Sequence, residues 1–207
     1  MSNILSIHPE QPQARLIAQA ADIIKDGGLV ACPTDSGYAL VGRVEDAQIN
    51  ERIRRIRHVD ERHHFTLLCR DLSEIATYAR VDNIQYRLLK ATTPGSYTFI
   101  LEGSKELPRR MLHPKRKTLG LRIPDTPLIA ALLTELNSPM VSSTLLLPDE
   151  PEPLSDAFDI AERLEKQLDL IIEAGTCRAQ ATTVIDLTSG SPVLIREGKG
   201  DLTPFGL

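Results

Sequence analysis

Apolar residues recur with a helical period in several parts of the chain. The segment from Pro12 to Asp26 carries its apolar side chains on one face and is followed by two glycines, which predicts a helix ending there. A second helix is predicted from Asp46, as its N-cap, to Arg57, with Ile49, Ile53 and Ile56 on one face. The same criteria predict helices over residues 72–79, 83–91, 127–136 and 156–167.

Short apolar runs between these helices predict strands. They lie at residues 29–33, 65–69, 97–101, 118–123, 140–147, 170–173, 183–187 and 193–196. Helices and strands alternate early in the chain, whereas strands cluster late. We therefore expect an α/β fold with a twisted, open, mixed sheet and flanking helices, rather than a purely parallel sheet.

A proline-rich acidic segment, residues 148–153, is the clearest break in this pattern. Little chain follows it, so we expect a surface loop rather than a domain boundary, and a single domain over residues 1–207.

Composition narrows the class of protein. Apolar residues make up 42% and charged residues 25% of the chain, which is typical of a soluble globular protein. Aromatic residues are only 4% and tryptophan is absent, which argues against a base-stacking platform for single-stranded nucleic acid. No apolar run is long enough to span a membrane, no secretory signal is evident, and the three cysteines are widely spaced. We expect a cytoplasmic protein that does not associate with membranes.

Positive charge is concentrated although the formal net charge is −4. Four arginines fall within residues 52–57, and seven basic residues against one acidic residue lie between Gly103 and Arg122. Residues 149–173 hold nine acidic and two basic residues. The basic stretches fit either an anion-binding surface or solvated faces, and the pattern alone leaves both open.

Hydroxyl residues gather where predicted strands begin or end. They occur at residues 34–36, 96–98, 142–144 and 182–183. Such hydroxyls can hold phosphate or carboxylate oxygens at the strand ends of an open sheet, but each site taken alone is better explained by turn or cap residues.

The stronger catalytic patterns are missing. The chain has no P-loop, no GxGxxG after a strand and no GxSxG. His63 and His64 lie near Cys69, but adjacent residues of a strand point to opposite faces, so we expect no metal site there.

Several segments in a fixed order resemble the YrdC/YciO family, and most of all its YciO branch, from about Ile7 to Gly198. They are KDGGLVACPTDSGYAL, RIR, TPGSYTFIL, LGLRIP, PMVSST, TTVIDL and VLIREG. The resemblance implies a twisted open α/β sheet with a basic concave face. It also implies binding of a nucleotide and a small amino acid, because family members make threonylcarbamoyl-AMP from threonine, bicarbonate and ATP with Mg²⁺, for tRNA modification. No tightly bound cofactor is expected, and tRNA or double-stranded RNA is a further expected partner.

The resemblance also implies site residues. The family's Lys-x-Arg pair, which handles the nucleotide phosphates, falls on Arg55 and Arg57, the expected catalytic pair. The remaining nucleotide-binding positions fall on Thr98, Thr144 and Arg196.

The threonine-binding positions form a second group. The family's threonine-contacting threonine falls on Thr34, its carboxylate-holding arginine on Arg122, and a further hydroxyl on Thr182.

The chain departs from the family pattern at positions close to the reaction. The lysine of Lys-x-Arg is Arg55, whose planar fork is wider than an ammonium, and an asparagine is replaced by Leu146, which cannot form a side-chain hydrogen bond. Three interpretations follow: a synthase with weak or altered activity, a non-catalytic binder of tRNA or double-stranded RNA through residues 52–57 and 105–117, or a remnant that binds another small anion.

Overall fold

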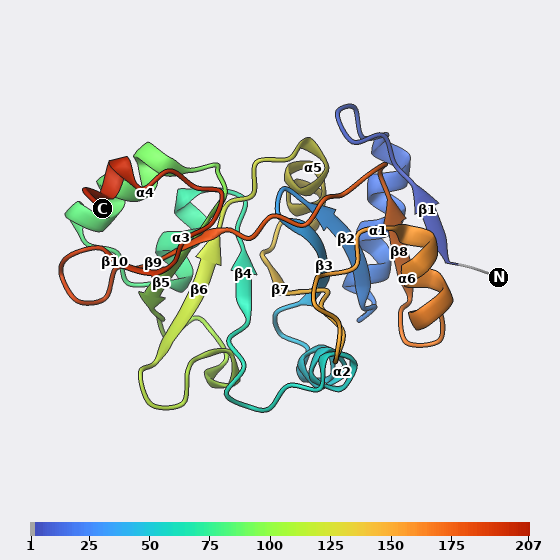
Figure 1. Ribbon diagram of the computed structural model, residues 1–207, viewed down its shortest axis with the longest axis horizontal. Coiled ribbons are helices and arrows are strands. Elements are labelled where there is room, and N and C mark those ends of the chain that lie inside the picture. The colour runs from blue at the N-terminus through green and yellow to red at the C-terminus, as the bar shows by residue number, and fades with distance from the viewer. Residues whose placement is uncertain (1–2) are drawn as a thin grey trace.

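One ten-stranded sheet runs through the whole molecule (Figure 1), and the computed structural model describes residues 3–207 of the chain. The order of strands across the sheet is β1-β8-β2-β3-β7-β4-β6-β5-β9-β10. The strands are β1 Ile4–Ser6, β2 Val30–Thr34, β3 Gly37–Arg43, β4 Thr66–Leu68, β5 Tyr97–Glu102, β6 Thr118–Arg122, β7 Met140–Thr144, β8 Leu170–Glu173, β9 Thr183–Asp186 and β10 Val193–Arg196.

The sheet is mixed, as predicted. Strands β1, β2 and β8 pair in parallel, as do β4 with β6 and β5 with β9. The centre is antiparallel, because β2 and β3 form a hairpin and β7 pairs with both β3 and β4. The structure therefore confirms the predicted α/β class.

Within residues 3–207, six α-helices flank the sheet, and most of them begin at a side-chain cap. They are α1 Ala14–Lys25, α2 Ala47–Arg57, α3 Leu72–Tyr78, α4 Asn83–Thr92, α5 Pro127–Leu136 and α6 Ala157–Leu164. The predicted cap of α2 is confirmed, since a carboxylate oxygen of Asp46 accepts a hydrogen bond from the Gln48 amide at 2.8 Å. Among residues 3–207, no helix is long and apolar enough to cross a membrane.

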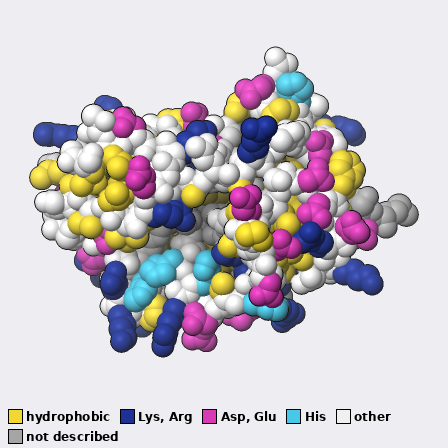
Figure 2. Space-filling view, viewed as in Figure 1, with side chains coloured by type: hydrophobic (Ala, Val, Ile, Leu, Met, Phe, Trp, Pro, Cys, Tyr) yellow, Lys and Arg dark blue, Asp and Glu magenta, His cyan; other side chains and the backbone are white. Residues whose placement is uncertain are grey.

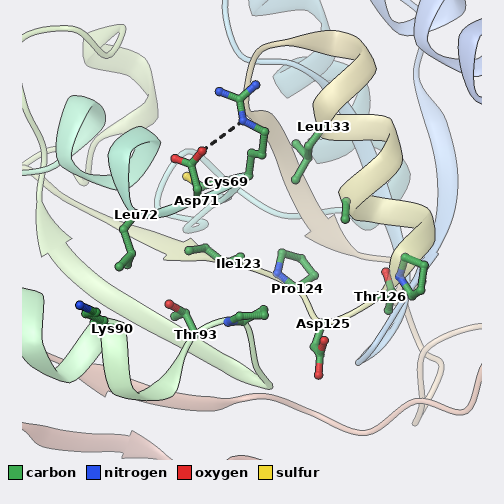
Figure 3. A pocket seen from close by; sticks show the side chains of 14 residues that line it. Cys69, Asp71, Leu72, Lys90, Thr93, Ile123, Pro124, Asp125, Thr126 and Leu133 are labelled. Carbon is green, nitrogen blue, oxygen red and sulfur yellow. Dashed lines mark hydrogen bonds and ion pairs between the residues drawn. The ribbon is translucent and has the colours of Figure 1, made fainter.

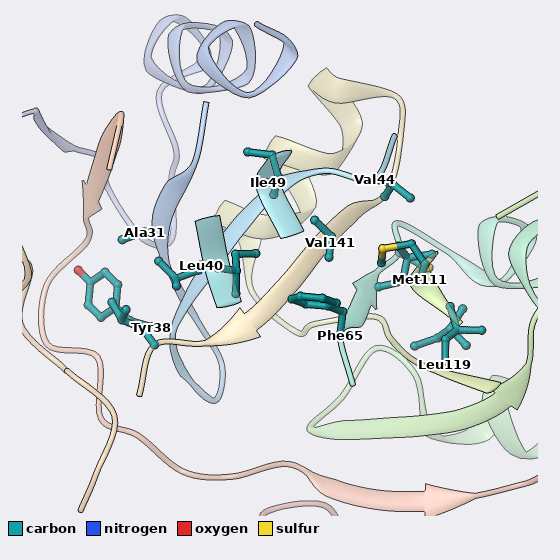
Figure 4. Close-up of a cluster of buried hydrophobic side chains, with 14 of the residues drawn as sticks. Ala31, Tyr38, Leu40, Val44, Ile49, Phe65, Met111, Leu119 and Val141 are labelled. Carbon is teal, nitrogen blue, oxygen red and sulfur yellow. The ribbon is translucent and has the colours of Figure 1, made fainter. Parts of the chain in front are cut away.

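Alternation along β2 and β3 separates two hydrophobic cores. Ala31, Tyr38 and Leu40 point to the core that contains the isoleucines of α2 (Figure 4). Val30 and Val41 point to the opposite face, where α1 and α5 pack. A strand buried on both faces has no polar–apolar alternation in its sequence.

The main error of the sequence prediction lies in this hairpin, because β3 is a short apolar run between Gly37 and Gly42 that follows β2 almost at once. Strand β3 was not predicted, although it lies at the centre of the sheet. Only Asp35 and Ser36 separate the paired residues Thr34 and Gly37, so the segment interpreted as a loop after a strand is a tight hairpin. The short edge strand β1 was also missed, and the strand predicted over residues 140–147 ends at Thr144.

The acidic, proline-rich loop at residues 148–153 does not divide the sheet. Strands β8, β9 and β10 follow this loop in sequence, yet β8 pairs with β2 and β9 pairs with β5. The late segments thus complete both halves of the sheet formed by the earlier ones.

The contact between α2 and β3 generates a stability prediction. A Cβ atom at Gly42 would lie 2.7 Å from Cγ2 of Ile49, closer than van der Waals contact. We expect Gly42→Ala to lower the free energy of unfolding by about 1–3 kcal/mol through overpacking, measured by urea denaturation. In an Ile49→Ala background, Gly42→Ala should lower the free energy of unfolding by clearly less. An equal loss in both backgrounds would contradict this packing.

Candidate functional site

A cavity of about 440 Å³ opens on the sheet at its central strands. Figure 2 shows a hollow on this face, with histidine and basic side chains along its lower edge. Residues from β2 to β7, β9, β10 and the end of α2 line it, and none of the described residues that line it is acidic.

The cavity brings together most of the residues expected from the sequence. Seven of the eight predicted site residues line it, although they are far apart in the chain. They are Thr34, Arg57, Thr98, Arg122, Thr144, Thr182 and Arg196.

Arg55 is the exception. Its side chain is exposed on α2 and is not among those that line the cavity. Residues two apart on a helix point to nearly opposite sides, so Arg55 and Arg57 cannot face one cavity together in this conformation. The structure therefore does not bring the expected catalytic pair together, and a role for Arg55 stays a prediction.

Arg57 is held from three sides at the end of α2. Its Nε donates to the backbone oxygen of Leu146 at 3.3 Å, and its Nη1 donates to Oγ of Ser143 at 2.6 Å. The same Nη1 lies 3.0 Å from Nε2 of His63. Burial lowers the pKa of Arg57, but a guanidinium starts so high that it remains a cation. The helix end thus presents a fixed positive charge to the cavity.

Arg122 is engaged by the hairpin turn that joins β2 and β3. It forms an ion pair with Asp35, and its Nη1 donates to Oγ of Ser36 at 2.8 Å. Both side chains of the ion pair are buried, and burial lowers the pKa of Arg122 while Asp35 opposes that shift. The Nε of Arg122 is buried without a partner. The fork expected to hold a ligand carboxylate therefore already holds a carboxylate of the protein.

The threonines of the cavity differ in their surroundings. Hydroxyls of Thr98 and Thr182 lie 2.8 Å apart, and Nη2 of Arg196 donates to the backbone oxygen of Thr182 at 2.9 Å. The Thr34 hydroxyl donates to the backbone oxygen of Gly37 at 2.7 Å. The turn role that the sequence left open for Thr34 is thus present, whereas Thr144 is exposed at the cavity.

The cavity residues that were not predicted include two histidines, an arginine and a serine: His63, His64, Arg116 and Ser143. The histidines were expected on opposite faces of a strand, but β4 begins only at Thr66, and both line the same cavity. Nε2 of His63 lies 2.9 Å from Oγ of Ser143. Their closeness in sequence to the arginines of α2 was the only signal of this arrangement. Within residues 3–207, no group of three His, Cys, Asp or Glu side chains could hold a metal ion.

A second cavity, of about 450 Å³, lies beyond the ends of β4 and β6 (Figure 3). Apolar side chains such as Leu72, Ile123 and Leu133 form much of its wall, and Arg70 is paired with Asp71 at 3.2 Å. None of the predicted site residues lines it, so the candidate site is the first cavity.

The Asp35–Arg122 ion pair generates a second prediction. Asp35→Asn keeps the size of the side chain but leaves the buried guanidinium without its counter-charge. We expect the free energy of unfolding to fall by about 3–5 kcal/mol in urea denaturation. Asp125→Asn, at a nearby exposed carboxylate, serves as the control and should change stability by at most about 0.5 kcal/mol. Equal midpoints for Asp35→Asn and wild type would show that Arg122 does not depend on Asp35.

Comparison with known proteins assigns this chain to a family. The family model Sua5_yciO_yrdC, described as "Telomere recombination", matches residues 22–198. The YciO protein of Escherichia coli K12 is 54% identical over 205 residues, which is 99% of this chain and 100% of that protein. The crystal structure of E. coli YciO superposes with a TM-score of 0.94, covering 99% of this chain and 100% of the other.

More distant relatives have a named activity. The threonylcarbamoyl-AMP synthase of Pyrococcus abyssi is 28% identical over 190 residues, covering 86% of this chain and 53% of that protein. The crystal structure of P. abyssi Sua5 complexed with L-threonine is 27% identical with a TM-score of 0.85, covering 94% of this chain and 57% of that one. The chain belongs to the Sua5/YciO/YrdC family.

Proposed function

We propose that the cavity binds ATP and a small amino acid, threonine, and that the protein is an L-threonylcarbamoyladenylate synthase-type nucleotidyltransferase. The observation that carries this proposal is the convergence of Arg57, Arg122 and Arg196 with five threonines on one cavity, where none of the described lining residues is acidic. The named activity of the distant relatives, and the L-threonine in one of their structures, support the same chemistry.

Besides Arg116 at its exposed edge, the cavity has two cationic groups. One is Arg57 at the end of α2, hydrogen-bonded to Ser143. The other contains Arg122 and Arg196, which are close enough for Arg196 to lower the pKa of Arg122. Guanidinium groups bind phosphate and carboxylate oxygens with paired donors, so two separate groups suit a nucleotide with a second, carboxylate-bearing substrate.

The Asp35–Arg122 pair fits an amino acid better than a simple carboxylate. An amino acid carries a carboxylate, which complements Arg122, and an ammonium, which complements Asp35. The Asp35 carboxylate does not line this cavity but is paired with Arg122, which does. A bound amino acid can therefore exchange partners with the ion pair without leaving either buried charge uncompensated. The unpartnered Nε of Arg122 provides one further donor for the ligand carboxylate.

The reaction proposed for this site has two steps. The amino group of threonine combines with bicarbonate to give a carbamate and water. A carbamate oxygen then bonds to the α-phosphorus of ATP as the bond to pyrophosphate breaks. Charge shifts to the leaving phosphates, where Arg57 and Arg196 provide preorganised positive charge.

Magnesium enters this proposal only as part of the substrate. The described residues offer no cluster of three metal-ligating side chains, and the Asp35 carboxylate is paired with Arg122. Mg²⁺ is commonly held by substrate phosphates and water with few protein ligands, so MgATP is the form we expect to bind.

RNA binding remains a separate interpretation. Lys105, Arg109, Lys115, Arg116 and Lys117 are exposed, and Arg116 also lines the cavity. Such a surface is compatible with a phosphate backbone, and phosphate contacts carry no sequence information. We therefore treat tRNA binding as one outcome of the test below.

The test is pyrophosphate release by the purified protein with ATP, threonine and bicarbonate. We expect release that requires all three. Arg57→Ala should weaken ATP binding by about 10- to 150-fold, the loss of one charge-assisted contact, and Arg55→Ala should weaken it less. Arg15→Ala, which removes an exposed arginine of α1, is the matched control.

Two results would overturn this proposal. One is the absence of pyrophosphate release together with the absence of ATP binding. The other is tRNA binding that weakens steeply with salt while ATP does not bind, which would favour the RNA-binding interpretation.

A further inference from the structure

The contacts among Arg57, His63 and Ser143 determine where the protons lie. A guanidinium has only donors, so Nη1 of Arg57 donates to Nε2 of His63 across 3.0 Å, and Nε2 carries no proton. Oγ of Ser143, 2.9 Å from the same nitrogen, must then donate to it, and it also accepts from Arg57 at 2.6 Å. His63 is therefore a neutral imidazole with its proton on Nδ1.

The groups that face His63 favour this neutral form. Arg57 and Arg54 reach it from α2, and His64 and Asp60 from its own loop. From β7 the polar neighbour is Ser143, and the ring of Phe65 lies edge-on at 5.3 Å. Burial, followed by the charge of Arg57, lowers the pKa of His63 to about 4, and Asp60 opposes this only weakly.

This arrangement is not a serine nucleophile with its base. No carboxylate within residues 3–207 hydrogen-bonds to the ring of His63, so nothing would stabilise an imidazolium formed by taking the proton of Ser143. The adjacent Arg57 would oppose that charge. Arg57 and Ser143 can donate here, His63 can do so once it is protonated, and none of the described residues that line the cavity is acidic. An anion would therefore complete the arrangement.

A phosphoryl group bound at Arg57 would reverse the local charge balance. Its oxygens would accept from Arg57, leaving Nε2 of His63 without that donor and close to negative charge. A proton on Nε2 would then donate to a phosphoryl oxygen, and the Ser143 hydroxyl would be free to turn toward another.

We propose that His63 takes up a proton when a phosphoryl anion binds at Arg57, and that the imidazolium, with Ser143, completes a phosphate subsite. This inference rests on the anion-binding part of the proposed function, and it is independent of threonine and of turnover. The ligand class is a tetrahedral oxyanion, such as one phosphate of a nucleotide or the pyrophosphate product. Affinity for such an anion should rise as the pH falls, because protonation and binding favour each other.

The test is an NMR titration of the histidine side chains with and without saturating sulfate, which keeps both charges over this pH range. We expect the His63 ring to stay neutral down to about pH 5 without sulfate, in keeping with its pKa of about 4, and to titrate at least one pH unit higher with sulfate. That shift corresponds to an about tenfold gain in sulfate affinity on protonation. His8, far from the cavity in sequence and exposed, is the internal control.

Two variants make the assignment specific. His63→Gln removes the His63 signal and keeps an amide donor, so sulfate should still bind but with little dependence on pH. Ser143→Ala should weaken sulfate binding while leaving the proton uptake of His63 in place.

Three outcomes would overturn the proposal. They are an unchanged His63 titration while Arg57 signals report bound sulfate, an equal pH dependence of sulfate binding in His63→Gln, and no sulfate binding at all. Pyrophosphate release with unchanged His63 titration would reject this subsite and leave the proposed synthase activity standing. The reverse pattern would reject the synthase and leave the subsite.

Discussion

The site depends on one buried guanidinium, that of Arg122, and on protein acceptors for each arginine that the sheet and α2 present to the cavity. Arg122 is paired with Asp35, Arg57 donates to Ser143 and the backbone of Leu146, and Arg196 donates to the backbone of Thr182. A buried cation without such partners would be strongly destabilising. These contacts orient the charges before any ligand arrives, so little reorganisation is needed when an anion binds.

The sheet topology makes this arrangement possible. The strand order places β3, β7, β4, β6, β5 and β9 side by side, although they come from every part of the chain. Alternation directs one face of these strands to the helices and leaves small or polar side chains on the cavity side. The tight turn between β2 and β3 then brings Asp35 to Arg122 of β6, across residues 87 apart in sequence. One mixed sheet thus gathers residues that no local motif contains.

Much of this could be predicted from the sequence, and the failures have physical causes. Amphipathic helices and short apolar strands were predictable, because burial against the core shows in the spacing of apolar residues along the sequence. The central strand β3 was not, because its short apolar run lies between two glycines and follows β2 after a two-residue turn. The family resemblance located Arg57 and Arg122, but it could not show that Arg55 points away from the cavity or that Asp35 occupies the Arg122 fork. His63 and Ser143 are 80 residues apart, and only the pairing of β7 with β3 and β4 explains their contact.

The central claim is that one cavity holds a nucleotide and an amino acid together. Calorimetric titration of ATP into the protein, alone and with saturating threonine, tests it most directly. The account predicts one ATP site per chain and continued ATP binding in the presence of threonine, with threonine itself binding at one site. Absence of ATP binding under both conditions, or threonine that displaces ATP competitively, would contradict it.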